Sequence, residues 1–159
     1  MASILWMMKI YGKKERAIHM RKSNKLSFLP TLHEDIEQQY LFQWAERQVC
    51  VYPELKLLYH VPNGGKRNIG TAVKLKKQGV KAGVPDLCLP VPRGVHHGLY
   101  IELKVGKNKT SEKQDNWLEA LAEQGYSVHV FWSREEAQEK IIEYLKLKGA
   151  ERIENTIIF

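Results

Sequence analysis

The stretch VPDLCLPVPRGVHHGLYIELK, residues 84–104, constrains the fold of this chain more than any other. Two short apolar runs, Leu87–Leu89 and Leu99–Val105, flank a link that holds prolines and glycines. This pattern predicts two strands joined as a hairpin. Because side chains alternate along a strand, Glu102 and Lys104 share one face of the second strand.

Asp86 stands at the start of the first strand and meets this pair near the open end of the hairpin if the strands pair in this register. Carboxylate oxygens are hard ligands suited to Mg²⁺ or Mn²⁺, and an ammonium group can steady a nucleophilic water or a developing negative charge on phosphate. The alternative interpretation of the ELK tripeptide is a salt bridge between Glu102 and Lys104 on a solvated strand face.

The remaining pattern predicts a helix, a strand and a short helix before this hairpin, and a helix, a strand and a helix after it. Ser111 and Gln114 match a capping box, so Gln114 could serve only to close the start of its helix. A strand, a crossover helix and a further strand favour parallel pairing between the strands of Tyr100 and Val128. The predicted fold is therefore α/β, with a mixed sheet flanked by helices. Other elements are expected at residues 34–48, 55–61, 71–79, 112–124 and 126–132, followed by a last helix that Ser133 caps. The first helix is expected to carry an apolar stripe of Ile36, Tyr40, Leu41 and Trp44, and the last one a stripe of Ala137, Ile141 and Leu145.

The charge of the chain is positive and unevenly distributed. The formal net charge is +7, and residues 1–30 hold seven lysines and arginines against one glutamate. That excess is also compatible with a solvated tail. Residues 62–85 carry six lysines and arginines and no acid, which is the better indication of a nucleic-acid partner. Adjacent glycines let backbone N–H groups approach a phosphate, although an ordinary Asn-Gly turn is the alternative. The candidate nucleic-acid contacts are Asn63, Gly64, Gly65, Lys66, Arg67, Lys74 and Lys77.

Other classes of protein receive little support from the sequence. No stretch approaches the roughly 18 apolar residues of a membrane span and no signal peptide is recognisable, so we expect an intracellular protein with no membrane partner. Cys50 and Cys88 lack a metal-ligand spacing and are predicted to be reduced core thiols. His60, His96 and His97 lack a tetrahedral zinc ligand set and are expected at the surface.

The order of these features resembles the PD-(D/E)XK nuclease superfamily, and more closely its VRR-NUC domains, which occur in phage proteins and in DNA-repair nucleases. The features are GVPD, then IELK with Glu102 sixteen residues after Asp86, the Ser/Gln helix start and the upstream PNGGKR loop. The resemblance implies a restriction-endonuclease-like α/β fold. It also implies a stand-alone, phage-type VRR-NUC domain over residues 31–148, between a basic N-terminal extension outside the core, residues 1–30, and a C-terminal tail, residues 149–159.

Carried over residue by residue, the resemblance makes Asp86 and Glu102 metal ligands and Lys104 the residue that assists the attacking water. The glutamine that follows the lysine strand in the family matches Gln114. An acid from the first helix completes the ligand set. Glu34 is preferred because Gln38 follows it in the family spacing ExxxQ, and Glu37 remains the alternative.

The function that the resemblance implies is a DNA endonuclease that depends on Mg²⁺ or Mn²⁺ and needs no organic cofactor. Members in phage cut branched DNA such as four-way junctions, often as homodimers, so structure-selective cutting and a homodimer are further expectations. Two alternatives remain open: a non-catalytic nucleic-acid-binding module that keeps the nuclease-like fold, and a nuclease that cleaves RNA.

Overall fold

The computed structural model of the protein describes residues 30–62 and 69–149. All but the last residue of the predicted N-terminal extension, the glycine-rich loop at residues 63–67 and all but the first residue of the predicted tail lie outside these ranges. The described elements follow one another as helix, 3₁₀-helix, strand, helix, two strands, helix, strand and helix. They are α2 (Pro30–Gln48), η1 (Pro53–Leu57), β1 (Tyr59–His60), α3 (Ile69–Lys77), β2 (Leu87–Leu89), β3 (Leu99–Leu103), α4 (Glu112–Glu123), β4 (Ser127–Phe131) and α5 (Arg134–Leu145).

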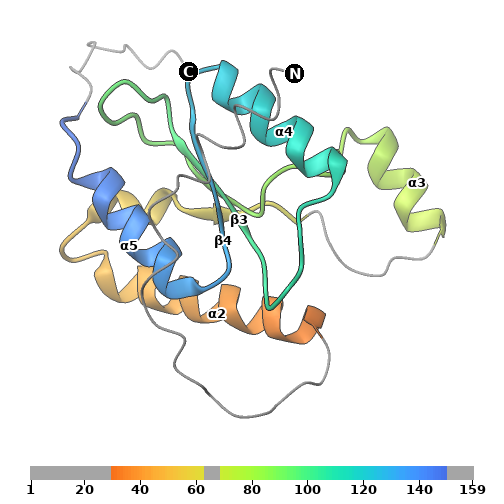
Figure 1. The fold of residues 1–159 in the computed structure, drawn as a ribbon, viewed down its shortest axis with the longest axis horizontal. Coiled ribbons are helices and arrows are strands. Elements are labelled where there is room, and N and C mark those ends of the chain that lie inside the picture. The colour runs from red at the N-terminus through yellow and green to blue at the C-terminus, as the bar shows by residue number, and fades with distance from the viewer. Residues whose placement is uncertain (1–29, 63–68, 150–159) are drawn as a thin grey trace, which may run out of the picture.

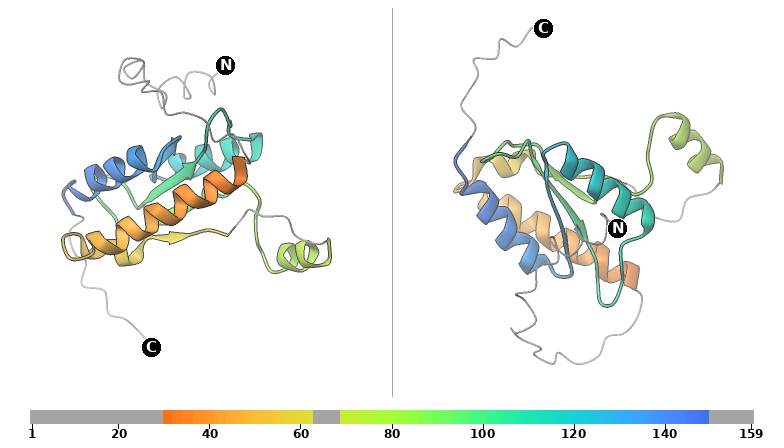
Figure 2. Two further views of the ribbon diagram at one scale, coloured as in Figure 1. Left: turned by 90° about the horizontal axis from the view of Figure 1, so that it is seen from below. Right: turned by 45° about the horizontal axis from the view of Figure 1, so that its top comes forward.

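The four strands form one mixed sheet in the order β1-β2-β3-β4. The pairs β1 with β2 and β2 with β3 are antiparallel, whereas β3 and β4 are parallel with Tyr100 beside Val128. The hairpin and the parallel pair that the sequence predicts are both confirmed. The helices α2 and α5 lie against one face of the sheet and α4 lies against the other (Figures 1 and 2). The α/β class with a mixed sheet between helices is therefore confirmed.

The hydrophobic core fills the space between the sheet and the helix pair α2 and α5. Leu41 and Ala45 of α2 meet Ala137 and Ile141 of α5 and the apolar face of β3, all almost fully buried. Burial of each large aliphatic side chain stabilises the fold by about 2 kcal/mol. The predicted stripe of α5, which ends at Leu145, is confirmed, because its members lie in this cluster.

Tyr40 departs from the predicted apolar stripe of the first helix, because it is 49% exposed. The guanidinium of Arg134 lies over its ring, 4.9 Å from the centroid. A cation over an aromatic face is a favourable arrangement outside the core. Leu41, which is also predicted on that stripe, and Ala45 occupy the core positions.

The predicted strand over residues 55–61 is largely wrong. Pro53 opens the 3₁₀-helix η1, where its fixed φ is compatible with the first turn. Leu55 and Leu58 are both buried, and their three-residue spacing matches a 3₁₀ turn rather than a strand. The strand is reduced to Tyr59–His60, and the backbone N–H of Val61 donates to the Asp86 carbonyl at 2.8 Å beyond it.

Local turn chemistry sets the boundaries of α4 and α5, whereas α2 begins at Pro30 rather than residue 34 and α3 is Ile69–Lys77 rather than residues 71–79. Ser111 and Gln114 form a reciprocal capping box at the start of α4. Ser133 caps α5 by accepting from the Glu136 backbone N–H, whereas the Glu136 side chain accepts from the backbone N–H of Trp132. Gly125 follows α4 with φ +81°, a conformation in which a residue with a Cβ would be strained.

The two cysteines occupy different environments. Cys88 is buried in β2 and Cys50 is exposed after α2, and both are free thiols. The prediction of two core thiols is therefore wrong for Cys50, which lies in the turn that follows α2 rather than on its buried face. The described helices include none with the length and apolarity that a membrane span requires.

Candidate active site

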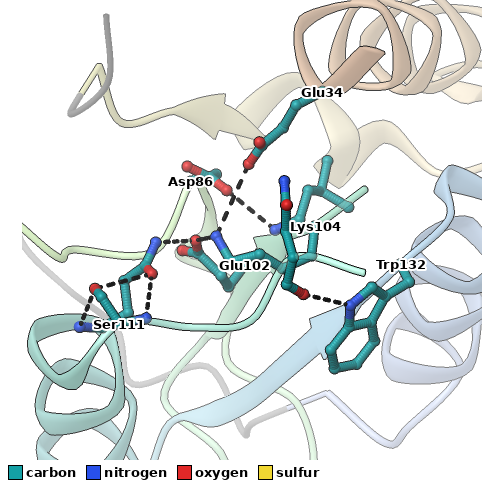
Figure 3. A network of polar contacts seen from close by, with 9 residues as sticks. Glu34, Asp86, Glu102, Lys104, Ser111 and Trp132 are labelled. Carbon is teal, nitrogen blue, oxygen red and sulfur yellow. Dashed lines mark hydrogen bonds and ion pairs between the residues drawn. The ribbon is translucent and has the colours of Figure 1, made fainter. Parts of the chain in front are cut away.

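The hairpin of β2 and β3 brings Asp86 and Glu102 together. Leu87 pairs with Ile101 in the antiparallel register, so Asp86, one residue earlier, lies beside Glu102, one residue later. The Asp86 carboxylate accepts a 3.0 Å hydrogen bond from the backbone N–H of Leu103, which holds it against β3 (Figure 3). The two acids meet at the open end of the hairpin, as predicted from the sequence.

Glu34 adds a third carboxylate from the N-terminal part of α2. One oxygen from each of Glu34, Asp86 and Glu102 lies within 4.8 Å of the other two. Figure 3 shows the Glu34 side chain reaching down from α2 toward Asp86 and Glu102. This is the one group of three or more potential metal-ligating His, Cys, Asp or Glu side chains within the described ranges, and it contains no histidine.

Glu37, the alternative acid of the same helix, is used differently. Its carboxylate accepts from the Arg134 guanidinium at 3.1 Å and from the Arg134 backbone N–H at 3.4 Å. Glu37 therefore ties α2 to the first residue of α5. Of the two acids that the sequence left open, the structure brings Glu34 to the hairpin carboxylates and not Glu37.

Lys104 and Glu102 form a buried ion pair. The Lys104 ammonium donates to Glu102 Oε1 and lies 3.8 Å from a carboxylate oxygen of Glu34. Glu102 is fully buried and Lys104 is 7% exposed. The salt bridge considered for the ELK tripeptide therefore forms, but its strand face is buried rather than solvated. The other oxygen, Glu102 Oε2, is buried and has no hydrogen-bond partner.

Gln114 joins the helix start to the acids. Its side-chain oxygen accepts from the Ser111 backbone N–H at 2.9 Å, which completes the capping box. Its Nε2 amide donates to Glu102 Oε1 (Figure 3). The two roles considered for Gln114, closing the helix start and reaching the acids, are filled by opposite ends of one amide group.

Burial and mutual repulsion make these carboxylates weak acids. Desolvation, followed by the charge of Asp86, raises the pKa of Glu102 to about 7, although Lys104 opposes the shift. Desolvation also raises the pKa of Asp86, against the lowering effect of the Leu103 hydrogen bond. The pKa of Glu34 is raised by burial too, against the effect of Lys104. A further positive charge among these carboxylates would favour their ionised forms and lower their pKa values.

The donor set of this site fits a divalent cation. Glu34, Asp86 and Glu102 offer hard oxygen ligands, which Mg²⁺ and Mn²⁺ prefer. A buried carboxylate oxygen without a donor, such as Glu102 Oε2, is destabilising unless a partner satisfies it. A cation held by these three residues would satisfy that oxygen and offset their mutual repulsion.

The basic residues outside this cluster are only partly described. Lys74 and Lys77 are exposed on α3, a helix that stands apart from the sheet (Figure 1). The other predicted nucleic-acid contacts, from Asn63 to Arg67, lie outside the described residues.

Two contacts at the site are not predicted from the sequence. The His60 ring lies with Nδ1 3.0 Å from the Asp86 carbonyl oxygen, and Trp132 Nε1 donates to the Asn108 carbonyl at 2.9 Å. His60 is exposed, as predicted. No local pattern signals these contacts, because their partners are 26 and 24 residues apart.

The fold and the site together define a class of protein. The sheet is mixed and lies between helices, its central hairpin carries two acids and a lysine, and an acid from the first described helix joins them, as the resemblance to nuclease domains implies. The VRR-NUC domain matches residues 29–135. This chain belongs to the VRR-NUC family, and that membership implies a nuclease-type function.

A solved structure supports the same assignment. A protein described as a VRR_NUC domain protein is 32% identical to this chain and superposes with a TM-score of 0.61. The match covers 73% of this chain and 90% of that chain. No curated protein matched the chain.

Proposed function

We propose that the protein is a metal-dependent DNA endonuclease that hydrolyses phosphodiester bonds. The observation that supports this most strongly is the convergence of three carboxylates and a buried lysine, with one carboxylate oxygen lacking a donor. In this proposal Glu34, Asp86 and Glu102 hold Mg²⁺ or Mn²⁺. The bound cation would supply Lewis-acid stabilisation of the charge that develops on phosphate.

The remaining site residues act on the water and on the carboxylates. Lys104 lies among the acids and can donate a hydrogen bond to a nucleophilic water or to a phosphate oxygen. Gln114 holds the Glu102 side chain through its amide, so its role is positioning. The water oxygen forms a bond to phosphorus as the P–O bond to the leaving sugar oxygen breaks. The proton of the water passes to solvent, and the leaving alkoxide takes up a proton from solvent.

The DNA substrate is proposed to be branched, such as a four-way junction, and the active form to be a homodimer. Lys74 and Lys77 of α3, together with the loop from Asn63 to Arg67, are proposed to contact the phosphate backbone. Support comes from the absence of acids between residues 62 and 85 and from the exposure of both lysines. Phosphate contacts of this kind position the nucleic acid without reading its sequence.

The test is cleavage by the purified full-length protein with Mg²⁺ or Mn²⁺ on linear, flap and four-way DNA, and on matched RNA. We expect cleavage of branched DNA to require the cation and to disappear in Asp86→Asn. DNA binding should remain, because loss of an acid lowers the repulsion of phosphate. The matched control is Asp35→Asn, which removes the same charge from an exposed position beside Glu34.

The outcomes separate the alternatives. Binding without cleavage of any substrate, under varied salt and with either cation, would show a non-catalytic nucleic-acid-binding module. Preferential cutting of the matched RNA would show a ribonuclease. Wild-type cutting by Asp86→Asn would show that Asp86 is wrongly assigned as a ligand.

A further inference from the structure

A second basic surface lies next to the carboxylates. The turn between β3 and α4, Val105–Ser111, carries Lys107 and Lys109, both exposed. The turn contains no acid, and the first one after it is Glu112. It follows Lys104 directly and belongs to neither α3 nor the glycine-rich loop.

Both ends of the β3–α4 turn are tied to the same carboxylate. Lys104, immediately before the turn, donates to Glu102, and Gln114, in the first turn of α4, donates to the same oxygen. A chain spans at most about 3.6 Å per residue, so the Lys107 Cα lies within ~11 Å of the Lys104 Cα. That distance is close to the Debye length of about 10 Å at 0.1 M salt. Lys107 therefore lies within electrostatic range of any phosphate that meets Lys104.

The middle of the β3–α4 turn is held in place. The Asn108 backbone N–H donates to the Val105 carbonyl at 3.2 Å, and the Asn108 carbonyl accepts from Trp132 Nε1 at 2.9 Å (Figure 3). Gly106 has φ +64°, which supplies the bend. Trp132 directly follows β4. Its hydrogen bond therefore ties Asn108, the residue between Lys107 and Lys109, to the end of the parallel strand pair β3 and β4.

A cationic turn beside a cluster of acids has a clear electrostatic use. Three carboxylates repel the phosphate backbone, and Lys104, the cation that pairs with two of them, is 7% exposed. Exposed cations on a fixed turn compensate for that repulsion where the strand enters the site. A turn whose shape is set before binding also loses less entropy when the lysines engage phosphate.

We propose that Lys107 and Lys109 contact DNA phosphates that flank the scissile bond, and that Trp132 positions them through Asn108. This inference rests on the proposed nuclease function for its substrate and assigns a binding surface that the function itself does not require. The occupant is the sugar–phosphate backbone, because the exposed charges of the turn are two ammonium groups, which pair with phosphate without requiring a base sequence.

The test is the salt dependence of DNA affinity in a Glu102→Gln background, where the probe is expected to remain uncut. The affinity of the full-length protein for fluorescent linear and four-way DNA is measured by anisotropy between 50 and 200 mM NaCl, conditions of the kind in which phosphate contacts dominate. Each lost phosphate contact flattens the plot of log affinity against log salt by about 0.9. The double variant Lys107→Ala/Lys109→Ala should therefore gain ~12-fold less affinity than its parent when salt falls from 200 to 50 mM.

The matched control is Lys146→Ala/Lys148→Ala. These lysines have the same spacing, are both exposed and follow α5 near the hairpin link, at the other end of the sheet. Their removal changes the net charge equally and should leave the slope unchanged. Equal slopes for the two double variants would overturn the inference, because only total charge would then matter. Restored affinity in Lys107→Arg/Lys109→Arg would support it.

Trp132→Phe tests the positioning role separately. The substitution removes the indole donor to Asn108 and keeps both lysines, so affinity should fall while the salt slope stays the same. Unchanged affinity in a variant with unchanged thermal stability would refute the role of Trp132. The proposed function fails separately, if the wild type cuts no DNA, and the slopes can still be measured in that case.

Discussion

Replacing Glu102 with glutamine should stabilise the metal-free protein at alkaline pH. The carboxyl is fully buried among the charges of Asp86 and Glu34. Its Oε1 atom accepts from Lys104 and Gln114, and a glutamine oxygen can accept from the same two donors. The new amide nitrogen takes the place of Oε2, which has no donor, and lies among carboxylates that can accept from it.

The magnitude follows from the raised pKa. Burial, with the charge of Asp86, moves the pKa of Glu102 from 4.5 to about 7. Each tenfold change in acid strength is worth about 1.4 kcal/mol, so ionising this carboxyl in the folded state costs about 3 kcal/mol. A raised carboxyl pKa means that the folded state holds the proton more tightly than the unfolded state. The corresponding stability is therefore complete below pH 4.5 and is lost as the pH rises through about 7.

The assay is urea unfolding in EDTA, followed by tryptophan fluorescence at two pH values. Glu102→Gln should exceed the free energy of unfolding of the wild type by less than about 1 kcal/mol near pH 5 and by ~3 kcal/mol near pH 8. The control is Glu139→Gln, an exposed position in the middle of α5, which should change little at either pH. Saturating Mn²⁺ should stabilise the wild type and not the Glu102 variant, because a ligand stabilises only the state that binds it.

A lower stability of Glu102→Gln than of the wild type near pH 8 in EDTA would refute this reasoning. It would mean that the ion pair with Lys104 stabilises the fold by more than the buried charge destabilises it. The net contribution of a buried ion pair to stability is the difference between the Coulomb attraction and the cost of desolvating both charges. The experiment measures which of these effects is larger.

Three further outcomes are expected. Lys104→Ala should slow DNA cleavage roughly a hundredfold or more. Its Mn²⁺ affinity, measured by calorimetry, should fall less than the Mn²⁺ affinity of Asp86→Asn. An equal fall in the two variants would contradict the assigned role of the lysine. Burial lowers the pKa of His129 from 6.5 to about 4, so the wild type should lose stability as the pH falls between these values. His129→Gln should remove about 3 kcal/mol of that loss in urea unfolding, and parallel profiles would contradict the assignment. Tyr144→Phe leaves the Val91 carbonyl without its 2.6 Å hydrogen bond and should cost about 1–2 kcal/mol, again by urea unfolding, with no change expected if the bond is absent in solution.

The hairpin that carries Asp86 and Glu102 could be predicted from local sequence. Alternation has a period of two along a strand, and a link of prolines and glycines permits only a few ways to turn. Asp86, Glu102 and Lys104 could therefore be placed at one end of the hairpin before any tertiary contact was known. The capping box at Ser111 is local in the same sense, because its partners are three residues apart.

The same local reasoning failed where two local patterns competed. The apolar residues from Leu55 to Val61 are compatible with a strand, yet Pro53 and the buried pair Leu55 and Leu58 form a 3₁₀ turn instead. Short apolar runs do not distinguish these structures by period alone. Only the pairing of Tyr59 with Cys88 limits the strand to two residues.

Tertiary packing decided which surroundings the site residues have. Alternation puts Glu102 and Lys104 on one strand face but does not reveal whether that face is solvated, and the folded chain buries both. Glu34 and Glu37 lie within one turn of the same helix, so sequence spacing leaves their roles open. The rotation of α2 is set by packing Leu41 and Ala45 against α5 and β3, and Arg134 of α5 then pairs with Glu37. Glu34 reaches the hairpin carboxylates because rigid helix placement depends on contacts among residues far apart in the chain, which no local pattern contains.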